Sequence, residues 1–420
     1  MTATPVSFVA FARLAAGTRP IHRQKGNPMQ NTRTKKSWRR ALFALISVCS
    51  VQPAAALDTH ALDAEVKRAM AATQARGLAI AVIDGGQIVH TGAYGVRNAA
   101  GDALELDSIM YGASLTKTAF AFCVMQLVDA GKLTLDRPLY QYLKSPLPSY
   151  PSEDNYAPWP DLAGDARWRR ITARHVLTHS TGFANYAFLE PDGKLRFHFD
   201  PGARYAYSGE GFILLQFVLE RGLGIDVGEA MQRLVFDRLQ MTTTSMRWRP
   251  SYARNLADGW TTEGTLVPHD ERSTVRAAGS MDTTIRDMAR FAAGYVRGLG
   301  LTTAAHAALL STQLAIHTRS QFPSLQPPSS GQNRDDLAAG LGVIVFDGPQ
   351  GAGFMKGGHN DATGNMMLCL QRGHRCVVLL ANDVRAEAAF PSLIRYVLGE
   401  TGAPWRWEYG DMVFSGASHQ

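Results

Sequence analysis

Long apolar runs and cysteine are both scarce in this chain of 420 residues. After residue 56, no uninterrupted apolar stretch reaches the ~18 residues that a helix needs to cross a bilayer. The chain has four cysteines, and neither a C-x-x-C nor an H-E-x-x-H spacing occurs. We therefore predict no bound metal, no cofactor and no stable membrane insertion of the mature part.

An excess of positive charge is also missing once the first 56 residues are set aside. The whole chain carries 43 Lys and Arg against 36 Asp and Glu. Residues 1–56 hold nine of the basic residues and no acidic one, which leaves 34 against 36, a net charge of about −2. The basic excess therefore gives no argument for nucleic-acid binding or for an anionic membrane surface.

Residues 29–56 have the three parts of an export signal. The basic part contains Arg33, Lys35, Lys36, Arg39 and Arg40. An apolar stretch follows over residues 41–51, and the alanines at 54–56 form a small-residue cleavage site. The apolar stretch is too short for a transmembrane helix. We therefore predict a periplasmic or secreted protein.

The mature chain is then expected to begin at Leu57. Residues 1–28 have no place in such a signal, so we interpret them as a misassigned extension ahead of a true start at Met29. The alternative is a lipoprotein anchor at Cys49, but Val48 stands where a small residue is wanted.

The order of the apolar segments predicts an α+β fold. A helix over residues 61–74 leads into a hairpin around Asp84 and Gly85. Further short apolar segments near the end of the chain predict an antiparallel meander. The expected strands are 78–83, 87–90, 340–346, 353–356, 365–370 and 376–381. A last helix over residues 386–398 would cover one face of the sheet beside the first helix.

The middle of the chain has a different pattern. Over residues 140–330, helical segments alternate with long connections rich in Pro and Gly. We predict an all-helical lobe inserted into the α/β part of one domain, residues 57–400, followed by a tail over 401–420. The cleft between the lobe and the sheet is a natural place for a substrate.

A serine and a lysine stand three residues apart where an apolar helix begins. Ser114 and Lys117 precede a nearly continuous apolar run over residues 118–128. Positions i and i+3 share a helix face, so the amine can reach the hydroxyl, which is a poor nucleophile without a base. The unpaired N–H groups of the first helical turn also suit a product oxyanion.

Further motifs follow this pair in a definite order. With residues 114–117, the segments are Gly131–Asp136, Ile171–Gly182, Pro201–Gly209, Ala277–Ser280 and Lys356–Gly358. Together they resemble the penicillin-recognising serine hydrolases, and the resemblance covers roughly residues 60–400. This superfamily contains class C type β-lactamases, D,D-peptidases, D-aminopeptidases and β-lactamase-like carboxylesterases.

The resemblance implies a role for each matching residue. Ser114 would be acylated, and Lys117 with Tyr207 would pass its proton to the leaving group, with either of the two as the base. Burial and neighbouring cations would draw the pKa values of both toward neutrality. Lys356, on an edge strand beside Gly358, would be a second cation that either holds a substrate carboxylate or lowers the pKa of Tyr207. The N–H groups of Ser114 and His359 would form the oxyanion hole.

Two positions depart from the family pattern. Gly209 stands where an Asn that binds the substrate acylamide is usual, and Glu210 next to it either substitutes in part or faces solvent. Gly357 replaces the usual hydroxyl residue after Lys356. Both departures weaken recognition of an acylamino β-lactam carboxylate more than they weaken acyl transfer.

Two residue pairs have open readings. His175 and His179 lie at helical i, i+4 spacing, which suits a metal, but the family match favours a structural role for both. Cys369 and Cys376 would face each other across strands if residues 372 and 373 form a hairpin turn. A disulfide between them and two unpaired thiols are both consistent with the sequence.

Three functions fit these observations. The first is an exported serine hydrolase that acts through an acyl-serine on small esters or on peptide or D-amino-acid amides. The second is a class C type β-lactamase. The third is a penicillin-binding sensor or scaffold that is acylated but turns over slowly. All three act on small molecules, and the residues that would bind them are Ser114, Lys117, Tyr207, Gly209, Glu210, Lys356, Gly358 and His359.

Overall fold

A computed structural model of the protein describes residues 57–328, 336–410 and 412. The predicted extension (1–28) and signal peptide (29–56) lie outside the described residues. The largest sheet has eight strands in the order β2-β1-β12-β11-β10-β9-β8-β7. Its strands are β1 (Gly77–Asp84), β2 (Gln87–Gly95), β7 (Leu314–Ala315), β8 (Ala338–Ala339), β9 (Ile344–Gly348), β10 (Gly351–His359), β11 (Gly364–Leu370) and β12 (Arg375–Ala381). All neighbouring pairs are antiparallel, as predicted.

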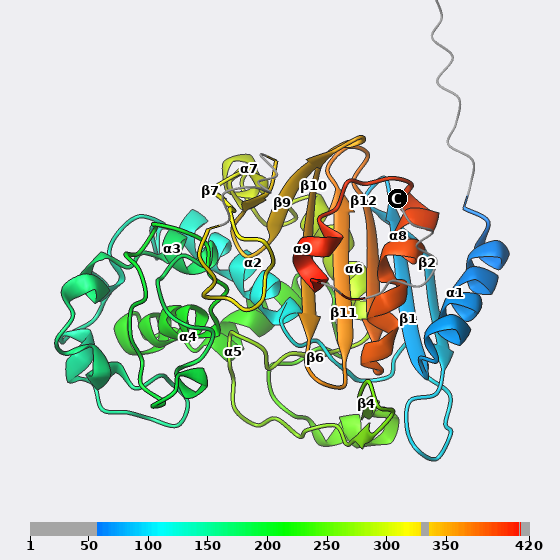
Figure 1. Ribbon diagram of the computed structural model, residues 1–420, viewed down its shortest axis with the longest axis horizontal. Coiled ribbons are helices and arrows are strands. Elements are labelled where there is room, and N and C mark those ends of the chain that lie inside the picture. The colour runs from blue at the N-terminus through cyan, green and yellow to red at the C-terminus, as the bar shows by residue number, and fades with distance from the viewer. Residues whose placement is uncertain (1–56, 329–335, 411, 413–420) are drawn as a thin grey trace, which may run out of the picture. The chain divides into compact units, whose positions relative to one another are not determined.

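Helices cover both faces of this sheet (Figure 1). One face packs against α1 (Thr59–Thr73) and α8 (Phe390–Leu398), and the other against α2 (Leu115–Asp129) and α6 (Ile285–Val296). Strand β12 is apolar without alternation because side chains on both its faces are buried, in two separate apolar clusters. The predicted α+β architecture with flanking helices is confirmed.

Helix α2 is enclosed along its whole circumference. Every side chain from Leu115 to Leu127 is buried, including that of Lys117. A helix that is apolar all round has no solvent face. It therefore requires partners on all sides, which the sheet supplies on one side and the helical segments on the other.

Short helices and turns make up the region between β2 and α6. They are η1 (Leu139–Tyr142), η2 (Leu147–Ser149), η3 (Trp159–Leu162), η4 (Ala166–Arg170), α3 (Ala173–Leu177), η5 (Ala187–Leu189), α4 (Gly209–Phe217), η6 (Val218–Gly222), α5 (Val227–Met231), η7 (Gln232–Asp237) and η8 (Pro250–Asn255). This region also contains strands of two small sheets. One sheet pairs β3 (Met110–Tyr111) with β6 (Asp282–Thr283), and the other pairs β4 (Gly259–Trp260) with β5 (Leu266–Val267).

The helical part is shorter than the predicted lobe of residues 140–330. Helix α6 falls inside that range, yet it packs on β1, β2 and β12, because its apolar side matches the sheet face. The chain then continues through α7 (Thr303–Leu310), which contacts α2, and later through η9 (Val384–Ala389). The predicted tail also contains a helix, α9 (Trp405–Tyr409). None of the described helices is both long and apolar enough to span a membrane.

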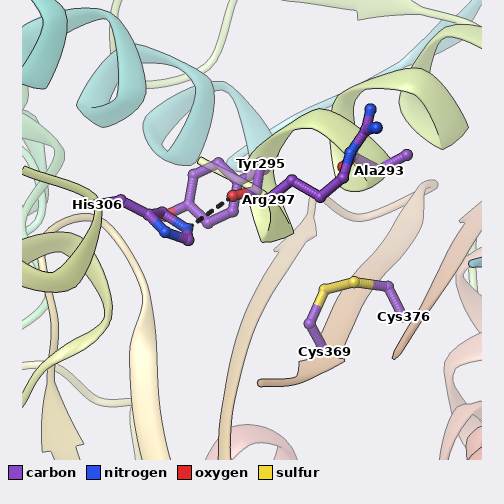
Figure 2. Close-up of a disulfide and its surroundings, with 6 residues drawn as sticks. All are labelled: Ala293, Tyr295, Arg297, His306, Cys369 and Cys376. Atoms are coloured by element: carbon purple, nitrogen blue, oxygen red, sulfur yellow. Dashed lines mark hydrogen bonds between the residues drawn. A yellow bond between two sulfur atoms is a disulfide. The ribbon is translucent and has the colours of Figure 1, made fainter. Parts of the chain in front are cut away.

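Cys369 and Cys376 form a disulfide, which resolves the alternative left open by the sequence. They are directly opposed in the register of β11 and β12. Figure 2 shows the bond on the face of the sheet toward α6, near Tyr295. The described Cys123 is a free, buried thiol in α2.

We expect loss of this bond to lower stability. Replacing both cysteines by alanine should reduce the free energy of unfolding by about 2 kcal/mol, because the closed loop is short. Denaturant unfolding under oxidising conditions measures the difference. Adding a reductant should lower the free energy of unfolding of the native protein nearly to that of the double variant. If the double variant is still less stable by the same amount under reducing conditions, lost packing and not the cross-link is responsible.

Candidate active site

The nucleophile candidate stands at the start of α2. Ser114 is the N-cap residue, and it follows Ala113, whose φ of +45° is in the left-handed region. The Nζ atom of Lys117 lies 3.0 Å from the Ser114 Oγ and donates to the carbonyl of Ala278 at 2.5 Å. The predicted proximity of hydroxyl and amine is therefore present in the folded chain.

Tyr207 approaches the same hydroxyl from the helical part. Its phenol donates to the Ser114 Oγ at 2.7 Å. The ring is held by His179, which stacks on it with centroids 4.3 Å apart and accepts a hydrogen bond from the N–H of Ser208 at 3.1 Å. The side chain of Ser208 in turn caps α4. A helix start and a stacked imidazole thus fix the phenol in place.

The two histidines have local structural roles. His179 supports Tyr207, and His175 forms a capping box with Thr172 at the start of α3. Among the described residues, no group of three or more His, Cys, Asp or Glu side chains is placed to hold a metal ion.

Strand β10 brings the second cation to the site. Lys356 is buried, and its Nζ lies 5.2 Å from the centroid of the Tyr207 ring, while the Nζ of Lys117 lies 5.0 Å from it. The Nζ of Lys356 donates to the carbonyl of Gly357. All four side chains of the predicted Ser, Lys, Tyr and Lys set therefore come together.

Gly358 allows the strand to lie against the start of α2. A Cβ at this position would be 3.0 Å from the N of Ser114 and 2.8 Å from the N of Leu115. Within the described part of the chain, the N–H of Ser114 has no hydrogen-bond partner. His359 ends β10 directly after Gly358 and lines the same cavity. The two residues whose N–H groups are predicted to form an oxyanion hole, Ser114 and His359, thus border one cavity.

Burial determines the protonation of the two candidate bases. Desolvation lowers the pKa of Lys117 well below its usual value, and the charge of Lys356 lowers it further. Desolvation also raises the pKa of Tyr207 well above its usual value, although its hydrogen bond to Ser114 acts in the opposite direction. The expectation that the pKa of Tyr207 is lowered toward 7 is wrong. The shift of the Lys117 pKa favours the neutral amine, and the shift of the Tyr207 pKa favours the neutral phenol.

Gly209 and Glu210, which follow Tyr207 and Ser208, do not have the surroundings that the sequence indicated. Glu210 neither faces solvent nor lines the cavity: its buried carboxylate accepts from the N–H of Ala187 at 2.8 Å. A Cβ at Gly209 would be 2.5 Å from the ring of Tyr186. Asn185 accepts from the N–H of Gly209 at 2.9 Å through its Oδ1. Tyr186 and Asn185 thus occupy the space beside Gly209.

These groups surround a cavity of about 330 Å³. Its walls come from seven separated parts of the chain. They are Tyr111, Ala113, Ser114, Lys117, Asn185, Tyr186, Tyr207, Ala278, Gln321, Phe322, Lys356, Gly357, Gly358, His359, Asn360 and Glu408. Sequence reasoning missed Asn185, Tyr186, Gln321 and Glu408, because none of them stands in a motif with a recognisable spacing.

Comparison with known proteins agrees with the geometry. The family model described as Beta-lactamase matches residues 62–399. The chain belongs to the beta-lactamase family. It has the fold of this family, and the family's serine hydrolases and esterases use small substrates.

Its curated relatives are distant. The unguisins hydrolase of Aspergillus campestris is 23% identical over 65% of this chain and 54% of its own length. The monacolin J acid methylbutanoyltransferase of Aspergillus terreus is 28% identical over 50% and 57%, and the lovastatin esterase of Penicillium rubens is 30% identical over 33% and 39%. The chain thus covers little more than half the length of the first two relatives and less than half the length of the third.

Solved structures with the same fold include penicillin-binding proteins and a carboxypeptidase. The octameric penicillin-binding protein homologue from Pyrococcus abyssi has a TM-score of 0.65 at 19% identity, over 82% of this chain and 78% of its own. The D-alanine carboxypeptidase AmpC from Burkholderia cenocepacia has a TM-score of 0.63 at 17% identity, over 81% and 99%. At these identities the likeness shows the fold alone.

The role of the Tyr207 phenol can be tested with a matched variant. Tyr207→Phe should lower kcat/KM by about two to four orders of magnitude if the hydroxyl transfers a proton. Tyr205→Phe is the control, since Tyr205 is also buried but its phenol donates to Gln321 and does not touch Ser114. Steady-state kinetics on an ester substrate measures both. Equal losses in the two variants would show that the phenol matters only for packing.

The Lys117 amine should set the acid limb of the pH profile. It acts as a base when neutral, so activity is present above its pKa and is lost as the pH falls through it. Lys356→Met removes a charge that lowers the pKa of Lys117, so the limb of kcat/KM should move to higher pH. Lys356→Arg keeps the charge and should leave the limb near its original position. An unmoved limb in Lys356→Met would mean that another group titrates.

Proposed function

We propose that the protein is an exported serine hydrolase that cleaves small esters, or peptide or D-amino-acid amides, through an acyl-serine intermediate. The observation that carries this proposal is the position of the Ser114 Oγ, 3.0 Å from the amine of Lys117 and 2.7 Å from the phenol of Tyr207. A nucleophile, a base and a proton donor thus meet at one atom.

The acylation step follows from this geometry. The neutral amine of Lys117 takes the proton of Ser114 while the Oγ attacks the substrate carbonyl. The N–H groups of Ser114 and His359 bind the oxyanion that develops. Tyr207 gives its proton to the leaving oxygen or nitrogen as the scissile bond breaks, and the proton on Lys117 restores the phenol.

Hydrolysis of the acyl-serine repeats these steps with water as the nucleophile. A water molecule loses a proton to the Lys117 and Tyr207 pair as it attacks the ester carbonyl, and Ser114 regains a proton when it leaves. The names of the relatives, a hydrolase, an esterase and an acyltransferase, support acyl chemistry of this kind.

Two observations support the preference for simple esters or amides over β-lactams. No side chain at position 209 can bind an acylamide, because the Tyr186 ring occupies that space. No hydroxyl at position 357 can bind a lactam carboxylate. A class C type β-lactamase remains the second candidate, since its acylation would use the same Ser114, Lys117, Tyr207 and Lys356.

Export is supported by two independent features. The basic and apolar segments of residues 29–56 are typical of a signal peptide. The disulfide between Cys369 and Cys376 is of the kind that persists in an oxidising compartment. N-terminal sequencing of the secreted protein would show whether it begins at Leu57.

The substrate class can be tested with two chromogenic substrates. The purified mature protein is expected to turn over p-nitrophenyl butyrate rapidly and nitrocefin slowly, because the site keeps the acyl-transfer groups and lacks two β-lactam contacts. Steady-state and pre-steady-state rates measure both, and Ser114→Ala should be inactive on each.

Each other outcome identifies a different function. Rapid nitrocefin turnover would assign a β-lactamase. A stoichiometric burst that then stops would assign a slow penicillin-binding sensor or scaffold. Full activity of Ser114→Ala would contradict the mechanism altogether.

A further inference from the structure

The last described helix contributes a carboxylate to the cavity. Glu408 belongs to α9, which is drawn in red in front of the sheet in Figure 1, and its carboxylate lies next to Gly357 of β10. Its side chain is 4% exposed and lines the same cavity as Ser114 and Lys356. A segment that the sequence indicated as a tail therefore forms one wall of the site.

Several contacts hold the chain next to this carboxylate. The indole of Trp407 donates to the hydroxyl of Thr318 at 3.0 Å and packs edge-on against Tyr205. The N–H of Gln321 donates to the carbonyl of Trp407 at 2.7 Å. The residue that precedes Glu408 is thus anchored to Thr318, Tyr205 and Gln321.

Glu408 occupies the place where a side chain at position 357 would lie. A Cβ built on Gly357 would be 2.1 Å from the Oε1 of Glu408. The hydroxyl residue that the resembled family has at this position would therefore require the Glu408 carboxylate to move from this place. The glycine and the carboxylate form a matched pair.

A carboxylate in place of a hydroxyl side chain changes the charge near the bound substrate. A hydroxyl next to Lys356 would donate to a substrate carboxylate, whereas an ionised Glu408 repels it and offsets the charge of Lys356. Burial raises the pKa of Glu408, while Lys356 and His359 act in the opposite direction. The other carboxylate nearby, Glu387, is paired with His359, with its Oε1 3.3 Å from the Nδ1.

We propose that Glu408 is a specificity residue that selects against substrates carrying a carboxylate near the scissile bond, so that the site takes uncharged esters or amides. The proposal rests on the hydrolase function proposed above. In a cavity of about 330 Å³ that holds both Ser114 and Glu408, a carboxylate close to the reacting carbonyl lies within reach of the Glu408 charge.

The test uses two substrates that differ in a single charge, 3-butyryloxybenzoate and its methyl ester. At pH 8, the native protein should prefer the methyl ester. Glu408→Gln should raise the ratio of kcat/KM for the acid over the methyl ester by about tenfold or more, because one nearby negative charge is removed and that of Lys356 is no longer offset. Glu408→Asp keeps the charge and should keep the preference.

Glu400→Gln is the matched control, since Glu400 lies in the same C-terminal segment with a largely exposed side chain; it should leave the ratio unchanged. Turnover of the methyl ester by Glu408→Gln shows that the variant is folded. If the native protein hydrolyses neither ester, the proposed function fails. If it hydrolyses the methyl ester but the ratio is the same in Glu408→Gln, or if it prefers the acid, only the role of Glu408 is overturned.

Discussion

Burial of the Lys117 amine is the constraint on which the rest of the site depends. An ammonium taken out of water costs several kcal/mol unless it is paired, and the described contacts of the Nζ are the Ser114 hydroxyl and the Ala278 carbonyl, with no carboxylate. The group therefore gives up its proton more easily than a solvated lysine does. The fold must exclude water all round α2 to achieve this, which explains why the helix is enclosed between the sheet and the helical part.

The same burial assigns different roles to Lys117 and Tyr207. Removing water favours the neutral form of both groups, and the neutral form of an amine is a base whereas that of a phenol is an acid. The two lysines lie over the face of the Tyr207 ring, where a cation also interacts favourably with a neutral aromatic. Their presence therefore does not require a phenolate. One physical effect thus favours a neutral amine and a neutral phenol, both within hydrogen-bond distance of the Ser114 Oγ.

Local sequence patterns were sufficient for the sheet and for the nucleophile. The predicted strand 365–370 differs by one residue from β11, because an apolar run bounded by turn residues has few other structures available. Ser114 and Lys117 could be paired from their spacing because both lie on one helix. The extent of the helical part was harder to predict, since the apolar face of α6 fits a sheet as well as a lobe.

The parts of the site that the sequence did not reveal are those that depend on long-range packing. Gly209 and Gly357 look like two losses when each motif is read alone. In the folded chain, the ring of Tyr186 fills the space beside the first, and the carboxylate of Glu408 fills the space beside the second. Neither Tyr186 nor Glu408 is close in sequence to the glycine beside which it packs. No motif spacing could therefore connect either pair. Because protein interiors are closely packed, the two glycines are explained by the side chains that occupy the space beside them, the Tyr186 ring at Gly209 and the Glu408 carboxylate at Gly357.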